Sequence, residues 1–208
     1  MRNYRALLIG NAPSVPSATL KRLAAQADVV LAVDGGADKA LRAGLSPNYV
    51  IGDLDSVSPR AQKMLTDRLI RVPTQENTDL EKALSWAVKQ QVTHATLVGF
   101  VGNRWDFSIG NLLALGRWAR KLSLCVVGDG WRIFPLVKSA QIVCQKNQRI
   151  SLLILKPCTG VTLSGCKYLL HDENLLPGTT RTLSNQTTAT RIRLSFTRGT
   201  LLVYLEGN

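Results

Sequence analysis

The sequence contains no apolar run of the roughly 18 residues that a membrane-spanning helix needs. Its first apolar stretch, residues 6–10, is shorter than the ~7–15 residues of a signal-peptide core. This stretch is instead typical of a buried first strand. We therefore expect a cytoplasmic protein without a membrane segment.

Cysteine and histidine are also scarce, with four and two copies. Because no Cys-x-x-Cys pair occurs, a structural zinc site is excluded, and we expect buried, reduced thiols. Acidic residues are outnumbered by basic ones, 14 against 26, which gives a formal net charge of +12. The basic side chains are spread along the chain without a long run. This pattern permits an anionic ligand such as a nucleotide but disfavours a nucleic-acid groove.

Three common catalytic motifs are missing. The chain has no G-x-x-x-x-G-K-[ST] phosphate loop, no G-x-G-x-x-G at the start of a helix, and no G-x-S-x-G nucleophile elbow. These absences exclude a Walker-type nucleotide site, a dinucleotide fingerprint and an α/β-hydrolase serine.

Apolar runs and helical patterns alternate through residues 1–128. Strands are predicted at 5–10, 29–33, 49–51, 69–72, 95–98 and 124–127, and helices at 17–26, 37–43, 59–66, 78–91 and 106–121. The fourth helix opens with Thr78 and Glu81 in capping-box spacing. This alternation predicts a parallel sheet covered on both faces, a three-layer α/β domain over 1–128.

The pattern changes after residue 128. Short β-type runs at 141–144, 149–155, 161–163, 191–196 and 201–205 are separated by Gly, Pro and Asn turns, and no helix is predicted. The polar stretch 171–174 reads as a turn. We predict a smaller antiparallel β-sandwich domain over 129–208, joined to the first domain through 126–131.

Acidic side chains concentrate in loops that follow predicted strands. Eight of the fourteen acidic residues lie in four such loops: Asp34 and Asp38; Asp53 and Asp55; Glu76, Asp79 and Glu81; and Asp106. One loop carboxylate alone is usually a turn former or a helix cap. Four acidic loops at one sheet edge favour a bound cation, and Mg²⁺ takes carboxylates together with phosphate oxygens. With Arg104 available for a phosphate, the pattern indicates metal-assisted phosphoryl transfer.

In this order, the segments resemble the motifs of the thiamine pyrophosphokinase (thiamin diphosphokinase) family. The matching segments are residues 34–38 (DGGAD), 52–56 (GDLDS), 78–79 (TD), 102–106 (GNRWD) with Asn111, 165–168 (GCKY) and 183–185 (LSN). The resemblance covers essentially the whole chain, including the change from an alternating α/β pattern to an all-β pattern after residue 128. The combination of these segments is fairly specific, although each one alone is weak.

The resemblance implies an enzyme that transfers diphosphate from ATP to the hydroxyethyl oxygen of thiamine, giving AMP and thiamine diphosphate. It implies Mg²⁺ and a homodimer with the thiamine site between one subunit's α/β domain and the other's β domain. The implied catalytic and metal residues are Asp53, Asp55 and Asp79. The implied nucleotide-binding residues are Gly35, Gly36, Asn77, Thr78 and Arg104, and the implied substrate-binding residues are Asp34, Asp106, Asn111, Ser184 and Asn185.

The chain departs from the family pattern at three positions. Phe107 stands where the family commonly has His, Asn103 stands where a second Gly often precedes the arginine, and Glu76 stands where the family often has Asp. Two alternatives stay open: a related diphosphokinase for another heterocyclic alcohol such as a hydroxymethyl pterin, and a non-catalytic nucleotide- or nucleic-acid-binding relative. The general base and the aromatic partner of the thiazolium ring, Tyr168 or a tryptophan, also stay open.

Overall fold

The computed structural model describes residues 3–13, 15–102 and 104–207. The chain forms two compact units, residues 1–114 with 121–129 and residues 115–120 with 130–208. Within the described ranges, no helix combines the length and apolar character that crossing a membrane would require.

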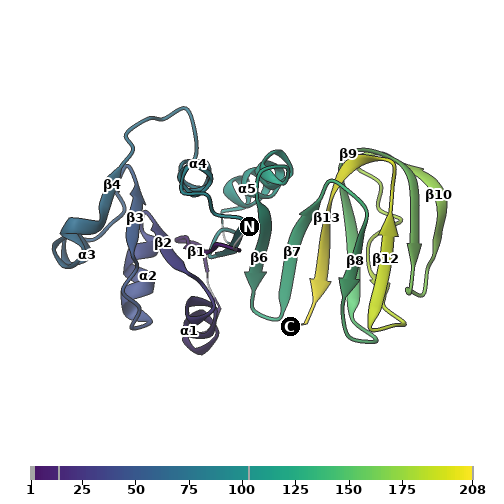
Figure 1. The fold of residues 1–208 in the computed structure, drawn as a ribbon, viewed down its shortest axis with the longest axis horizontal. Helices are drawn as coiled ribbons and strands as arrows, with labels where there is room; N and C mark the ends of the chain where they lie inside the picture. The colour runs from purple at the N-terminus through teal and green to yellow at the C-terminus, as the bar shows by residue number, and fades with distance from the viewer. Residues whose placement is uncertain (1–2, 14, 103, 208) are drawn as a thin grey trace. The chain divides into compact units, whose positions relative to one another are not determined.

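The first unit is built on a parallel sheet with the strand order β4-β3-β2-β1-β5-β6. Its strands are β1 (Arg5–Ile9), β2 (Val29–Val33), β3 (Tyr49–Gly52), β4 (Leu69–Arg71), β5 (His94–Val98) and β6 (Ser123–Gly128). Its helical segments are α1 (Ser17–Ala25), α2 (Gly36–Arg42), α3 (Pro59–Met64), η1 (Thr66–Arg68), α4 (Asp79–Lys89) and the first part of α5 (Trp105–Trp118). Figure 1 shows α1 and α2 on one face of this sheet and α4 on the other.

The apolar pattern of the sequence explains these layers. Alternate residues of β1, Leu7 and Ile9, pack with buried Leu20 of α1 and Ala40 of α2. On the opposite side, α4 begins where the Thr78 hydroxyl accepts a hydrogen bond from the Glu81 N–H and so caps the helix. The strand order reverses direction beside β1, whose neighbours are β2 and β5. In open parallel sheets, ligands bind beyond the carboxyl ends of the strands at such a switch point.

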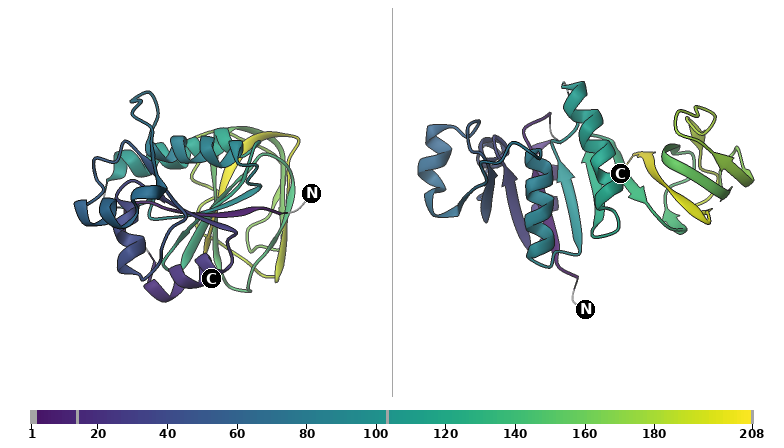
Figure 2. Two further views of the ribbon diagram at one scale, coloured as in Figure 1. Left: turned by 60° about the vertical axis from the view of Figure 1, so that its left-hand side comes forward. Right: turned by 90° about the horizontal axis from the view of Figure 1, so that it is seen from above.

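Strands alone make up the described elements from residue 123 onward. The second unit contains β7 (Trp131–Leu136), β8 (Ala140–Val143), β9 (Arg149–Ser164), β10 (Leu170–Leu175), β11 (Asn185–Gln186), β12 (Arg191–Ser195) and β13 (Arg198–Glu206). Within the described residues, these strands pair with one another in antiparallel fashion. Figure 2 shows these strands, coloured green to yellow, from two further sides.

One long strand belongs to both layers of the second unit. Residues 150–159 of β9 pair with β13, whereas residues 158–164 pair with β10 and β12. The two layers enclose an apolar core that includes Ile150, Leu152, Leu163, Leu194 and Val203. The predicted fold class, a parallel α/β part followed by antiparallel β structure, is therefore confirmed. Two details were wrong: 149–155 and 161–163 form one strand, and the predicted turn at 171–174 lies inside β10.

The cysteines of the second unit are buried thiols. Cys144, Cys158 and Cys166 are 8%, 1% and 4% exposed, and burial raises the pKa of all three, that of Cys166 to about 11. Because a thiolate is the reactive form, we expect these thiols to resist a disulfide reagent such as DTNB at pH 8 in the folded protein. Titration after unfolding in guanidinium should release all four. Fast modification of the three buried thiols before unfolding would contradict this packing.

Candidate active site

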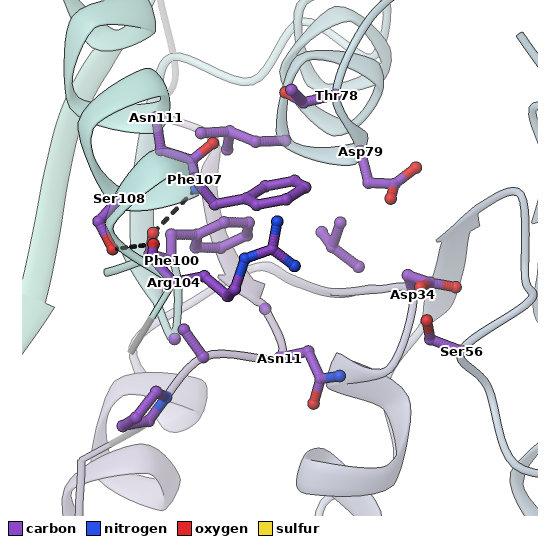
Figure 3. Close-up of a pocket in the computed structure, with 16 residues that line it drawn as sticks. Asn11, Asp34, Ser56, Thr78, Asp79, Phe100, Arg104, Phe107, Ser108 and Asn111 are labelled. Carbon is purple, nitrogen blue, oxygen red and sulfur yellow. Dashed lines mark hydrogen bonds between the residues drawn. The ribbon is translucent and has the colours of Figure 1, made fainter. Parts of the chain in front are cut away.

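A cavity of about 430 Å³ lies at the switch point of the parallel sheet. The loops after β1, β2 and β5 meet there with the first turns of α4 and α5 (Figure 3). One wall carries the apolar side chains Leu80 and Phe100, and the Phe107 ring lies against Arg104. The polar lining residues are Asn11, Asp34, Ser56, Thr78, Asp79, Arg104, Ser108 and Asn111. An apolar wall opposite charged groups suits a ligand with a flat ring at one end and phosphates at the other.

Three carboxylates come together beside this cavity; Asp34 lines it, whereas Asp53 and Asp55 are not among its lining residues. Asp34, Asp53 and Asp55 each offer one oxygen, and these oxygens lie within 4.8 Å of one another. Asp34 follows β2, whereas Asp53 and Asp55 follow β3, so two adjacent parallel strands bring the group together. Uncompensated carboxylates at such distances repel each other, and a hard divalent cation removes that repulsion. The cluster therefore has the chemistry of a Mg²⁺ site.

Local hydrogen bonds hold the Asp53 carboxylate ionised. The Asp55 N–H donates to Oδ1 and the Gln75 side chain donates to Oδ2, each at 3.3 Å. Chiefly through the Asp55 N–H, these groups lower the pKa of Asp53. The Ser56 hydroxyl in turn donates to Asp55 at 3.0 Å. The Gly52–Ser56 turn thus presents two charged carboxylates without the help of a helix.

Asp34 is the buried member of the cluster. Only 9% of it is exposed, and its Oδ1 has no hydrogen-bond partner in the described part of the chain. Burial, followed by the repulsion of Asp79 and Asp55, raises its pKa, although the Ser56 side chain and the Gly35 N–H oppose that rise. The residue has a positive φ of 48°, a conformation that Asp tolerates better than most residues. A buried, unpartnered oxygen of this kind fits a bound cation.

Asp79, the first residue of α4, lines the same cavity as Asp34, and its charge contributes to the raised pKa of Asp34. The Asp79 carboxylate accepts a 2.8 Å ion-paired hydrogen bond from Lys82, whose side chain is only 4% exposed. Thr78, one residue earlier, lines the same cavity and caps α4. The three carboxylates that the sequence grouped as metal ligands are therefore divided: Asp53 and Asp55 cluster with Asp34, whereas Asp79 bonds Lys82.

Arg104 supplies positive charge at the mouth of the cavity. Its Nε and Nη2 donate to the two oxygens of Asp106 at 3.0 and 2.6 Å, and its Cζ lies 4.7 Å from the centre of the Phe107 ring. The ion pair holds the pKa of Asp106 at about 2. Asn111 is buried nearby, where its amide donates to the Phe100 carbonyl at 2.9 Å.

Gly35 and Gly36 stand at the start of α2, outside the group of residues that line the cavity. A Cβ on Gly36 would lie 1.9 Å from the Ile9 carbonyl oxygen, and one on Gly35 would lie 2.5 Å from the Asn11 amide. Gly36 is thus required by close packing against the backbone at the end of β1, whereas the close contact at Gly35 is with the Asn11 side chain. Asn77 is exposed just before α4 and does not line the cavity either.

Ser184 and Asn185 lie in the second unit, where they line a separate cavity of about 250 Å³ with Tyr168, Lys167 and Arg149. Asn185 bonds the main chain of Tyr168 twice: its Oδ1 accepts from the Tyr168 N–H at 3.0 Å, and its Nδ2 donates to the carbonyl at 2.6 Å. Asn185 therefore fixes the segment that carries the exposed Tyr168 ring.

Sequence reasoning missed three polar residues that line the first site, Asn11, Ser56 and Ser108, and it also missed Lys82, the ion-pair partner of Asp79. Asn11 directly follows the strand predicted at 5–10, and Ser56 is the last residue of the 52–56 segment, but neither was predicted to contact a ligand. Lys82 was hidden because it occupies a buried helical position among apolar residues. The Asn103 departure lies outside the described residues.

Two family models match the chain in succession. The model described as "Thiamin pyrophosphokinase, catalytic domain" matches residues 20–127, which is more than half of the chain, and "Thiamin pyrophosphokinase, vitamin B1 binding domain" matches residues 139–201. The chain belongs to the thiamin pyrophosphokinase family. This membership confirms the family resemblance and the class of enzyme predicted from the sequence.

Individual relatives agree with the thiamin pyrophosphokinase assignment. A thiamine pyrophosphokinase of Bacillus subtilis is 27% identical over 184 residues, 83% of this chain and 85% of that protein. The crystal structure of the B. subtilis enzyme has a TM-score of 0.86 at 24% identity, with 98% of this chain and 99% of that one covered. Thiamin pyrophosphokinase from Candida albicans shares the fold with a TM-score of 0.86 at 17% identity, covering 99% and 90%. The matches give no support to the pterin or binding-protein alternatives.

Proposed function

We propose that this chain transfers a diphosphate group from ATP to the hydroxyethyl oxygen of thiamine, with AMP and thiamine diphosphate as products. The observation that carries the proposal is the carboxylate-lined cavity at the switch point, inside the segment that matches the family's catalytic domain. The cavity offers both an apolar wall for a base and charged groups for phosphates. Location in the cytoplasm remains a prediction from the sequence.

The acidic cluster supports a Mg²⁺ site. We propose that Asp53 and Asp55 hold the ion, with Asp34 as the third carboxylate of the cluster. Asp79 is a proposed catalytic and metal residue as well, although its carboxylate must then exchange or share its bond with Lys82. When bound, Mg²⁺ neutralises charge on phosphate oxygens and orients the transferred group. Lys82 keeps Asp79 facing the cavity, and Ser56 orients Asp55.

The remaining residues take part in binding. Arg104 is proposed to contact nucleotide phosphates, with Thr78 and Asn77 at the start of α4 and Gly35 and Gly36 at the start of α2 as further contacts. Asp106 is proposed to position Arg104 for the nucleotide, because its carboxylate accepts two hydrogen bonds from the guanidinium. Asn111 and Asp34 lie at the cavity wall, where they would meet substrate.

We propose that the second unit contributes to thiamine binding. The family's vitamin B1 binding domain matches residues 139–201, which include Tyr168, Ser184 and Asn185. A ring such as Tyr168 attracts the cationic thiazolium by its π-face. A homodimer is proposed on the family resemblance, and sedimentation at several protein concentrations tests it.

The decisive assay follows AMP formation from ATP and Mg²⁺, with thiamine, with a hydroxymethyl pterin, and with no acceptor. We expect AMP to form only with thiamine and thiamine diphosphate to appear by mass spectrometry in equal amount. Turnover of the pterin alone would favour the alternative acceptor. A folded protein without acceptor-dependent AMP, but with oligonucleotide binding that falls steeply with salt, would favour the binding-protein alternative.

A further inference from the structure

Arg104 is held from two sides by the first turn of α5. Asp106 occupies its Nε and Nη2 through two hydrogen bonds, and the Phe107 ring lies against the guanidinium, with Cζ 4.7 Å from the ring centre. Among the described residues, Nη1 has no acceptor, so this end of the guanidinium is left for a ligand. Figure 3 shows the guanidinium reaching into the cavity beside the Phe107 ring.

The backbone of Arg104 is fixed by the same helical turn. The buried Ser108 hydroxyl lies 2.9 Å from the Arg104 carbonyl and accepts a 2.9 Å hydrogen bond from the Gly102 N–H. Residues of the first turn of α5 therefore fix both the main chain and the side chain of Arg104. Exposed arginines usually lose considerable side-chain entropy on binding a ligand, and a side chain already held in place loses less.

Position 107 carries Phe, where the family resemblance implies His. A phenyl ring cannot exchange a hydrogen bond or a proton with a phosphate. It can attract a guanidinium through its π-face without neutralising the charge and without competing for hydrogen bonds. The ring is half exposed and lines the cavity, so its contact with Arg104 lies at the ligand's entrance.

We propose that Phe107 is a positioning residue that, together with Asp106, holds Arg104 with Nη1 directed at the nucleotide phosphates. The inference rests on the proposed function, because it takes ATP as the ligand. It assigns Phe107 a role that works through Arg104 and not through contact with the nucleotide base.

A double-mutant cycle separates these two roles. We expect Phe107→Leu to weaken ATP binding, measured by calorimetry with Mg²⁺, by about 2–5-fold, the range of a cation–π contact at an exposed site. In an Arg104→Ala background, the same substitution should have no further effect. Phe107→Tyr should restore affinity, since it keeps the π-face. Ile109→Ala is the matched control, because Ile109 is a similarly exposed apolar residue of the same helix, 55% against 50%.

A second binding measurement uses adenosine, because this ligand carries the base without the phosphates. Its affinity should be the same in the wild type and in Phe107→Leu. An equal loss for adenosine and ATP, or a loss that persists in the Arg104→Ala background, would overturn the proposal in favour of base stacking or a purely structural role. A wild-type protein that binds no ATP would instead overturn the proposed function itself.

Discussion

Replacing Asp53 with Asn is expected to lower the rate of AMP formation by about 100-fold or more, the usual cost of removing a group that organises transition-state charge. The amide can still accept the hydrogen bond from the Asp55 N–H, so the turn should keep its shape. What it lacks is the negative charge that completes the group of three carboxylates. Initial rates with ATP and thiamine over a range of Mg²⁺ concentrations measure the effect.

Stability should change far less than activity. Because local hydrogen bonds lower the pKa of Asp53, its negative charge is favourable in the folded protein, so Asp53→Asn should leave the melting temperature in metal-free buffer unchanged or slightly lower. The increase in melting temperature that Mg²⁺ gives to the wild type should be much smaller in the variant. Asp67→Asn, which changes an exposed acid of η1, is the matched control for both measurements. Undiminished activity in both Asp53→Asn and Asp55→Asn would remove the proposed metal site.

Gly36→Ala has the largest expected effect on folding. The added methyl carbon would lie 1.9 Å from the Ile9 carbonyl oxygen, and neither β1 nor α2 can move without disturbing buried packing. We expect the free energy of unfolding to fall by about 3 kcal/mol. For a chain of this size, such a loss corresponds to a melting temperature roughly 6–12 °C lower.

Gly110→Ala is the natural comparison. Gly110 lies in α5, and a Cβ there would meet no heavy atom within 4 Å. Since alanine favours the helix by about 1 kcal/mol over glycine, this variant should melt at the same or a higher temperature. Equal destabilisation by the two substitutions would mean that the contact with β1 does not explain the glycine at position 36.

The strands of the α/β part could be predicted because they are buried on both faces and appear as short apolar runs. Residues 29–33 are the clearest case, with the predicted and observed bounds identical. β10 could not be predicted, because its polar residues follow no alternation and its strand conformation comes from pairing with β9. Tertiary hydrogen bonding, and not local preference, determines that segment.

The sequence predicted which loops form the site, but it did not predict which side chains contact one another there. The positions of Asp53 and Asp55 two residues apart after a strand predicted their neighbourhood. The inclusion of Asp34 in that cluster depends on which strands are adjacent, and the pairing of Asp79 depends on which way Lys82 points from α4. Neither the strand order nor the direction of a side chain can be read from spacing alone.

The place of β13 has a consequence for synthesis on the ribosome. β13 lies between β7 and β9, which do not neighbour each other in the sheet. At about 5–20 residues per second, the interval between completion of β9 and completion of β13 lasts roughly 2–8 seconds. During that time, the nascent chain carries two unpaired strand edges rich in apolar residues. Such edges are targets for holding chaperones, and the second unit can close only when residues 198–206 have left the exit tunnel.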